Sequence, residues 1–75
     1  MNTECFRYGS QYIIVAVTDN YSIETYAPDD KETTDLIKSR LTENRGYHSY
    51  VVYKWEKWKY HDIERWTARN GKEVN

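Results

Sequence analysis

One run of eight residues, 11–18 (QYIIVAVT), constrains the fold more than any other segment of the chain. It is rich in β-branched residues and bounded by polar ones, a pattern that predicts a β-strand. Side chains alternate between the two faces of a strand, and this run is apolar at both alternating sets of positions. Because such a pattern is typical of strands inside a sheet, we expect residues 11–18 to form a central strand.

A hairpin is predicted directly after this strand. Asp19 and Asn20 follow it, and both residue types tolerate the left-handed conformation of a two-residue hairpin turn. Residues 21–26 then alternate, with Tyr21, Ile23 and Thr25 on one side, as expected of a half-exposed partner strand.

Residues 28–30 (PDD) open the one clear helical pattern. Asp29 followed by Glu32 has the spacing of a capping box, with Asp29 as the N-cap. Gly46 is the expected left-handed stop. We therefore predict a helix over about residues 30–44, lying across one face of a sheet. One side of this helix, whose apolar part is narrow, comprises Leu36, Ile37, Arg40 and Leu41, extended by Thr33 and Asn44.

The segment after the helix is again strand-like over residues 48–55, but its alternation then changes phase. Either a bulge at Glu56 and Lys57 shifts the alternation, or the strand turns there. We favour one long bulged strand leading into a last strand near residues 63–68, with Asn70 and Gly71 as a turn. In the alternative, residues 55–69 form a second helix. The predicted fold class is α+β, one helix packed on an antiparallel sheet, in the order ββαββ or, in the alternative, ββαβα.

Seventy-five residues make one domain, residues 1–75, for which we expect mobile ends at 1–8 and 72–75. The chain holds twelve aromatic residues and as many Ile, Leu and Val together. A domain of this size rarely buries twelve aromatics completely, so some are expected on the surface, where aromatics are common in binding sites.

The charge and the cysteine content exclude several classes of protein. A net charge of −1 argues against a strongly basic nucleic-acid module, although residues 47–75 carry six basic and four acidic residues. The lone Cys5 excludes an internal disulfide framework and a cysteine zinc site, which favours a reducing cytoplasm. We find no signal peptide and no apolar run approaching the ~20 residues of a membrane span.

Catalytic candidates are few. His61, Asp62 and Glu64 form the only cluster suited to a metal or to acid–base chemistry, with Asp62 and Glu64 expected on one face of a strand and His61 on the other. Cys5 with His48 or His61 as base is a weaker candidate. The glycines are too far apart for a phosphate-binding loop. We expect no enzyme activity, no cofactor and no metal.

Residues 53–60 (YKWEKWKY) and Trp66 are the main candidate for binding. This segment has three interpretations. It could bind a protein, because Trp and Tyr dominate protein-binding hot spots, or single-stranded nucleic acid, which aromatics interleaved with basic residues also suit. In the third, these residues simply pack in a sheet. Interspersed acids favour protein over nucleic acid. The predicted partner-binding residues are Trp55, Lys57, Trp58, Lys59, Tyr60, Arg65 and Trp66. The nucleic-acid alternative uses segment 53–66 with Lys54, Lys57, Lys59, Arg65 and Arg69 as phosphate contacts.

A second, acidic surface is predicted near the start of the helix, where four carboxylates favour the helix dipole and could also imitate phosphates. Its members are Asp29, Asp30, Glu32 and Asp35.

In size, in lacking a catalytic set and in its helix-on-sheet plan, the chain is similar to the small one-domain proteins that phages and mobile elements encode to block host machinery, including restriction and CRISPR complexes. That resemblance implies a non-catalytic binding protein that occupies the surface of a larger protein or nucleoprotein. A single-stranded nucleic-acid-binding protein is the alternative. An exposed edge strand could also pair with another copy to form a homodimer.

Overall fold

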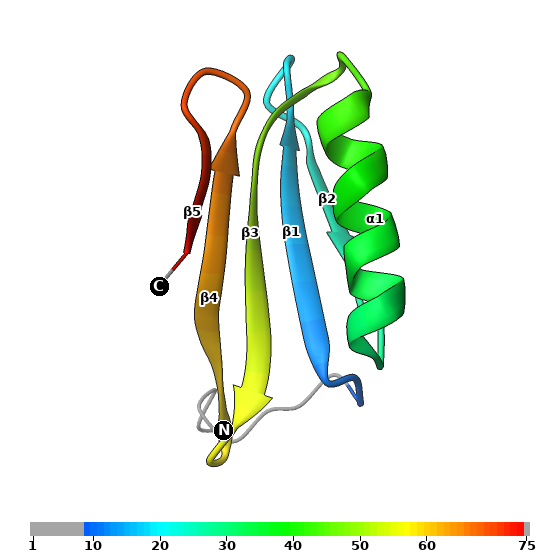
Figure 1. Cartoon of the computed structure of the whole chain (residues 1–75), viewed down its shortest axis with the longest axis vertical. Helices are drawn as coiled ribbons and strands as arrows, with labels where there is room; N and C mark the ends of the chain where they lie inside the picture. The colour runs from blue at the N-terminus through cyan, green and yellow to red at the C-terminus, as the bar shows by residue number, and fades with distance from the viewer. Residues whose placement is uncertain (1–8, 75) are drawn as a thin grey trace.

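The structure is a computed structural model that describes the backbone of residues 9–74 and the side chains of residues 9–72. One helix lies against one side of a five-stranded antiparallel sheet, which confirms the α+β class and the order ββαββ with one more strand at the end (Figure 1). The sheet order is β2-β1-β3-β4-β5. The elements are β1 (Tyr12–Thr18), β2 (Ile23–Tyr26), α1 (Lys31–Glu43), β3 (Tyr47–Glu56), β4 (Lys59–Thr67) and β5 (Gly71–Val74).

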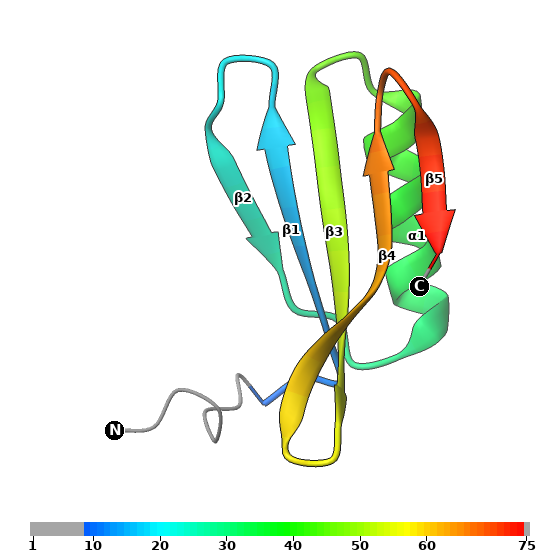
Figure 2. The same ribbon diagram turned by 90° about the vertical axis from the view of Figure 1, so that its left-hand side faces the viewer.

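The central position of β1 is confirmed, because it pairs with β2 on one side and with β3 on the other. Its alternation separates two faces of the sheet. Tyr12, Ile14 and Ala16 join Leu41 of α1 in the core beneath the helix, together with Tyr50 and Val52 of β3. Ile13, Val15 and Val17 lie on the other face by the same alternation. In Figure 2 the helix lies behind the strands, on one side of the sheet only.

The first hairpin forms, but its turn is longer than predicted. Four residues, 19–22, separate β1 from β2, and the backbone N–H of Thr18 donates to the carbonyl of Ser22 at 2.9 Å, which leaves residues 19–21 as the loop. The backbone N–H of Tyr21 donates to the carbonyl of Thr18 at 2.9 Å. Tyr21, at φ 64°, adopts the left-handed conformation that we had assigned to Asp19 and Asn20. This is the geometry of a three-residue loop, in which a turn is followed by one left-handed residue.

Both predicted ends of the helix need correction. The N-cap is Asp30, not Asp29: its carboxylate accepts a hydrogen bond from the backbone N–H of Thr33 at 2.6 Å. The helix ends at an extended Asn44, whose side chain accepts from the N–H of Gly46 at 3.1 Å, and Gly46 is not left-handed. The side chain of Asn44 thus bonds a backbone N–H just after the helix, where we had expected a left-handed glycine to end it.

The second half of the chain also differs from the favoured prediction. The phase change comes from a tight turn at Lys57 and Trp58, so β4 starts at Lys59 rather than near residue 63. The bulge lies elsewhere: Val52 pairs with Glu64 and Tyr53 with Asp62, which leaves Ile63 as the extra residue of β4. The alternative prediction of a second helix over residues 55–69 is wrong.

The turn predicted at Asn70 and Gly71 spans residues 68–70, and Gly71 already begins β5, an edge strand that we had not predicted. Of the ends expected to be mobile, residues 72–74 belong to β5, whereas 1–8 and 75, Cys5 included, lie outside the described residues. Over the described part of the chain, α1 is too short and too polar to cross a membrane.

Candidate binding surface

The tip of the β3–β4 hairpin carries the most exposed tryptophan among the described residues. Glu56 pairs with Lys59, so the loop consists of Lys57 and Trp58 alone. Both have positive φ, 50° and 70°, as in a type I′ turn, for which Asn and Gly are the favoured residues. A left-handed conformation costs residues with a β-carbon ~1–2 kcal/mol each. Trp58 is 81 % exposed, so burial of its side chain does not offset this cost.

The base of the hairpin is held by contacts with Ser10 and Gln11, the two residues before β1. Trp55 and Tyr60 face each other across the strands, with their ring centroids 5.0 Å apart and the rings at 71°. The Tyr60 hydroxyl donates to the carbonyl of Ser10 at 2.8 Å. Gln11 bonds the backbone of Trp55 twice, through its side-chain amide at 2.7 Å and its carbonyl at 2.8 Å. The turn is therefore presented on an ordered hairpin.

Charges around the hairpin are largely paired. Lys54 bonds Glu56 at 3.1 Å, and this bond raises the pKa of the Lys54 ammonium. Arg65 binds Asp62 at 2.7 Å and lowers the pKa of that carboxyl. Two of the basic residues proposed to contact phosphates thus already have carboxylate partners. Lys57 and Lys59 lie exposed beside Trp58.

The predicted partner-binding residues do not all lie together. Lys57, Trp58 and Lys59 form the tip, which we call the hairpin tip, and Trp55 and Tyr60 stand behind it. Arg65 pairs with Val51 farther along the sheet. Trp66 lies on the helix side, where it stacks on Tyr50 at 5.4 Å and 17° and packs against the core. The bulge and the turn are the reason: each changes which face the following residues occupy.

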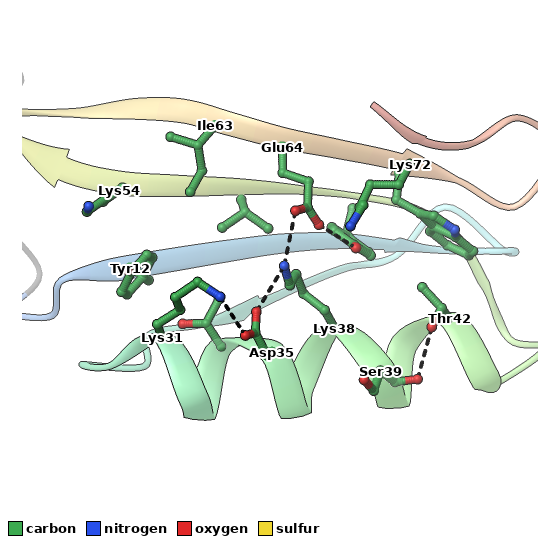
Figure 3. A pocket seen from close by; sticks show the side chains of 14 residues that line it. Tyr12, Lys31, Asp35, Lys38, Ser39, Thr42, Lys54, Ile63, Glu64 and Lys72 are labelled. Atoms are coloured by element: carbon green, nitrogen blue, oxygen red, sulfur yellow. Dashed lines mark hydrogen bonds and ion pairs between the residues drawn. The ribbon is translucent and has the colours of Figure 1, made fainter. Parts of the chain in front are cut away.

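The bulge also separates the residues of the catalytic candidate. Figure 3 shows Ile63 and Glu64 both pointing from β4 toward α1. Asp62, in register with Tyr53, lies on the opposite face, so the expectation that Asp62 and Glu64 share a face is wrong. His61 Nε2 lies 3.0 Å from the carbonyl of Glu56. Among the described residues, no three His, Cys, Asp or Glu side chains gather in a way that could hold a metal ion.

Glu64 belongs instead to a polar network between helix and sheet that we had not predicted (Figure 3). Only 7 % exposed, it accepts from Lys38 Nζ at 3.0 Å and from the Tyr50 hydroxyl at 2.8 Å. Lys38 also binds Asp35 at 3.1 Å. Burial and the Glu64 carboxylate raise the pKa of Tyr50. For Lys38, burial alone would lower the pKa of the ammonium, but its carboxylate partners raise it overall.

This network spans a groove of about 730 Å³ between α1 and the strands. Every buried side-chain nitrogen and oxygen atom among the described residues has a hydrogen-bond partner. The buried polar side chains of the groove therefore all have partners within the protein, and we interpret them as part of the packing between helix and sheet.

The predicted acidic surface has several roles within the fold. Asp30 caps α1, and its bonds to Thr33 lower the pKa of its carboxyl. Asp35 binds Lys31 at 2.9 Å as well as Lys38, and both contacts lower its pKa. Asp29 and Glu32 are exposed. Two of the four carboxylates thus have structural partners.

A further surface was missed by sequence reasoning: the sheet face turned away from α1. We call it the open face and define it by Ile13, Val15, Val17, Ile23, Val51 and Tyr53, which the pairing of β2, β1 and β3 places side by side. The signal was available, since residues 11–18 are apolar at both alternating sets of positions and one helix can cover only one face.

Comparison of the chain with protein-family models, with curated proteins and with solved structures finds no match. What the protein does is therefore inferred from its own residues.

Proposed function

We propose that the protein is a non-catalytic binding protein that docks its hairpin tip on the surface of a larger protein. The proposal rests mainly on the exposure of Trp58. Its side chain is 81 % exposed, on a turn whose two residues both have positive φ. Residues held in unfavourable backbone conformations are concentrated at functional sites. Tryptophan is also among the residue types most enriched in binding hot spots.

The ordered hairpin behind the tip supports the same function. Because Trp55 and Tyr60 are fixed by each other and by residues 10–11, little conformational entropy is lost when the tip is bound. Lys57 and Lys59 on either side of Trp58 suit a partner whose apolar pocket has an acidic rim. By occupying such a surface the protein would exclude other ligands from it, as inhibitors of macromolecular machinery do.

Single-stranded nucleic acid is the less favoured partner. Stacking on Trp58 with Lys57 and Lys59 on phosphates would use the same tip. However, Arg65 is bound to Asp62, and Arg69 lies in the turn at the other end of β4. The basic residues proposed to contact phosphates therefore do not form one continuous path along the hairpin.

Affinity capture from the native host's lysate, with and without nuclease, tests the proposal. The matched variants are Trp58→Ala and Leu36→Ala; Leu36 is a large apolar residue of α1 that is 58 % exposed. We expect a protein that survives nuclease treatment, is retained by Leu36→Ala and is lost with a folded Trp58→Ala. Retention by Trp58→Ala would refute the proposal. A nuclease-sensitive capture, with oligonucleotide affinity falling steeply as salt rises, would establish the nucleic-acid alternative instead.

A further inference from the structure

We propose that the open face is the interface of a symmetric homodimer, in which a second copy of this chain packs its own open face against the first. This inference concerns a different surface from the hairpin tip and does not depend on the proposed function.

The first argument is that the sheet has one helix for two apolar faces. A sheet with an apolar face is stable when another layer covers that face. Among the described elements, α1 covers the face of Ile14 and Val52, and no element covers the other. There Ile23 is 70 % exposed and Val15, Val17, Val51 and Tyr53 are only partly buried, whereas Ile13, at one end of the face, is 6 % exposed. Small domains often gain their missing stability by forming oligomers.

The second argument is the arrangement of polar and apolar residues on this face. Its apolar residues are contiguous over β2, β1 and β3 and continue, by register, to Trp55 and Tyr60 at the base of the hairpin. Along one side, β4 adds polar Asp62, Arg65 and Thr67. An apolar centre beside a polar rim is the usual anatomy of a protein interface.

The third argument is charge, which favours a second copy over a strongly charged partner. A symmetric dimer brings identical surfaces together, so a face with net charge would repel itself. In the described strands, β1, β2 and β3 place no charged side chain on the open face. The charged residues that β4 contributes, Arg65 and Asp62, bind each other at 2.7 Å. Over β1 to β4 the face is therefore neutral, and its apolar centre can meet a second copy without electrostatic cost. Glu73 of β5, in register with Arg65, adds one acidic position at the edge of the sheet, away from this centre.

The area is sufficient for such a dimer. The five strands, about 4.8 Å apart and about seven residues long on average at about 3.3 Å per residue, give the whole sheet a face of about 550 Å². The apolar centre on β2, β1 and β3 makes up about 330 Å² of it, and the rim on β4 and β5 makes up the rest. Two copies then bury about 1,100 Å², just above the roughly 1,000 Å² expected of a specific interface. Because this is the lower end of the range, we expect a dissociation constant on the order of micromolar.

Sedimentation equilibrium from about 1 to 200 µM, a range chosen around that expected constant, tests the proposal. The wild type should change from monomer to dimer within it. Val51→Lys, at the centre of the open face, should weaken the dimer by at least about 100-fold, since an unpaired charge would be buried. Ile23→Lys, at the exposed edge, should weaken it by about 10-fold without disturbing the core. Leu36→Lys, on α1 at a site that is 58 % exposed, is the matched control and should leave the dimer unchanged.

Circular dichroism establishes that each variant is folded, and Ile23→Lys keeps the test decisive if Val51→Lys unfolds. A wild type that remains monomeric at 200 µM would overturn the proposal, as would a dimer that all the open-face variants leave unchanged. Trp58→Ala should leave the dimer intact, so failure of the hairpin tip as a binding site and failure of the dimer are separate results.

Discussion

Replacement of Lys38 by methionine tests whether the network between helix and sheet works as an electrostatic unit. Lys38 Nζ contacts Glu64 at 3.0 Å and Asp35 at 3.1 Å, and its side chain is 19 % exposed. Methionine keeps most of the apolar stem and removes the ammonium group. Glu64 would then be a buried carboxylate whose remaining described partner is the Tyr50 hydroxyl.

The size of the effect follows from these contacts. Removal of one partner of a fully buried ion pair costs roughly 3–5 kcal/mol, because the remaining charge stays desolvated. Here Tyr50 still donates to Glu64, and the site of Lys38 retains some contact with solvent. We therefore expect Lys38→Met to lower the free energy of unfolding by about 2–3 kcal/mol.

The double variant Lys38→Met, Glu64→Gln separates charge from packing. Glutamine can still accept the Tyr50 hydroxyl but carries no charge, so the penalty of the single variant should largely disappear. We expect the double variant within about 1 kcal/mol of the wild type, with a coupling energy of at least about 1 kcal/mol in the double-mutant cycle.

Urea denaturation at pH 7 and one fixed protein concentration measures these differences, since a dimer makes apparent stability depend on concentration. The reasoning is wrong if Lys38→Met costs less than about 1 kcal/mol, or if the effects of the two substitutions simply add.

Three further predictions follow from the turn, the helix and the tryptophans. The double variant Lys57→Asn, Trp58→Gly introduces the preferred type I′ residues. It should raise the free energy of unfolding, measured by urea denaturation, by about 1–2 kcal/mol and should no longer bind the partner. A less stable variant would refute the left-handed conformation of residues 57 and 58. Lys31 and Lys38 lower the pKa of Asp35 below its ordinary 3.8, so the stability that ionised Asp35 contributes is present above that pH and is lost as the pH falls through the folded-state pKa. Melting temperatures measured from pH 5 to pH 2 should therefore fall less steeply for Asp35→Asn than for the wild type. Equal slopes would contradict this. Trp66→Ala should cost about 2–3 kcal/mol, because half-buried Trp66 stacks on Tyr50, whereas Trp58→Ala should change stability by less than about 0.5 kcal/mol; equal losses in thermal denaturation would show that Trp58 is not a surface residue.

The candidate surface could be predicted only in part. Composition and the interleaving of aromatic and basic residues indicate segment 53–66 as a contact region, and Lys57, Trp58 and Lys59 do lie exposed. The face occupied by each residue could not be predicted, because a turn built from Lys and Trp has no turn-forming residue type and the bulge at Ile63 has no sequence signal of its own. Trp66 and Glu64 consequently lie under the helix, away from Trp58.

The partners of the charged residues were equally beyond sequence reasoning. Glu64 and Lys38 are 26 positions apart, and only the packing of α1 across the sheet brings their charges to 3.0 Å. Asp30 and Thr33, by contrast, are only three positions apart. The N-cap that we predicted from local residue preferences, Asp29, is therefore within one residue of the observed N-cap.

By itself, the sequence determined the local elements of this protein: a central strand apolar on both sides, a hairpin, one capped helix and a strand-rich second half. These follow from periodicity and capping, which act between residues close in the chain. Only the tertiary structure decided that one face of the sheet lacks a helix, that Trp58 stands at a tip while Trp66 packs inside, and that Glu64 is neutralised by Lys38. These depend on strand register and on contacts between distant segments, where one extra residue moves a side chain from one face of the sheet to the other.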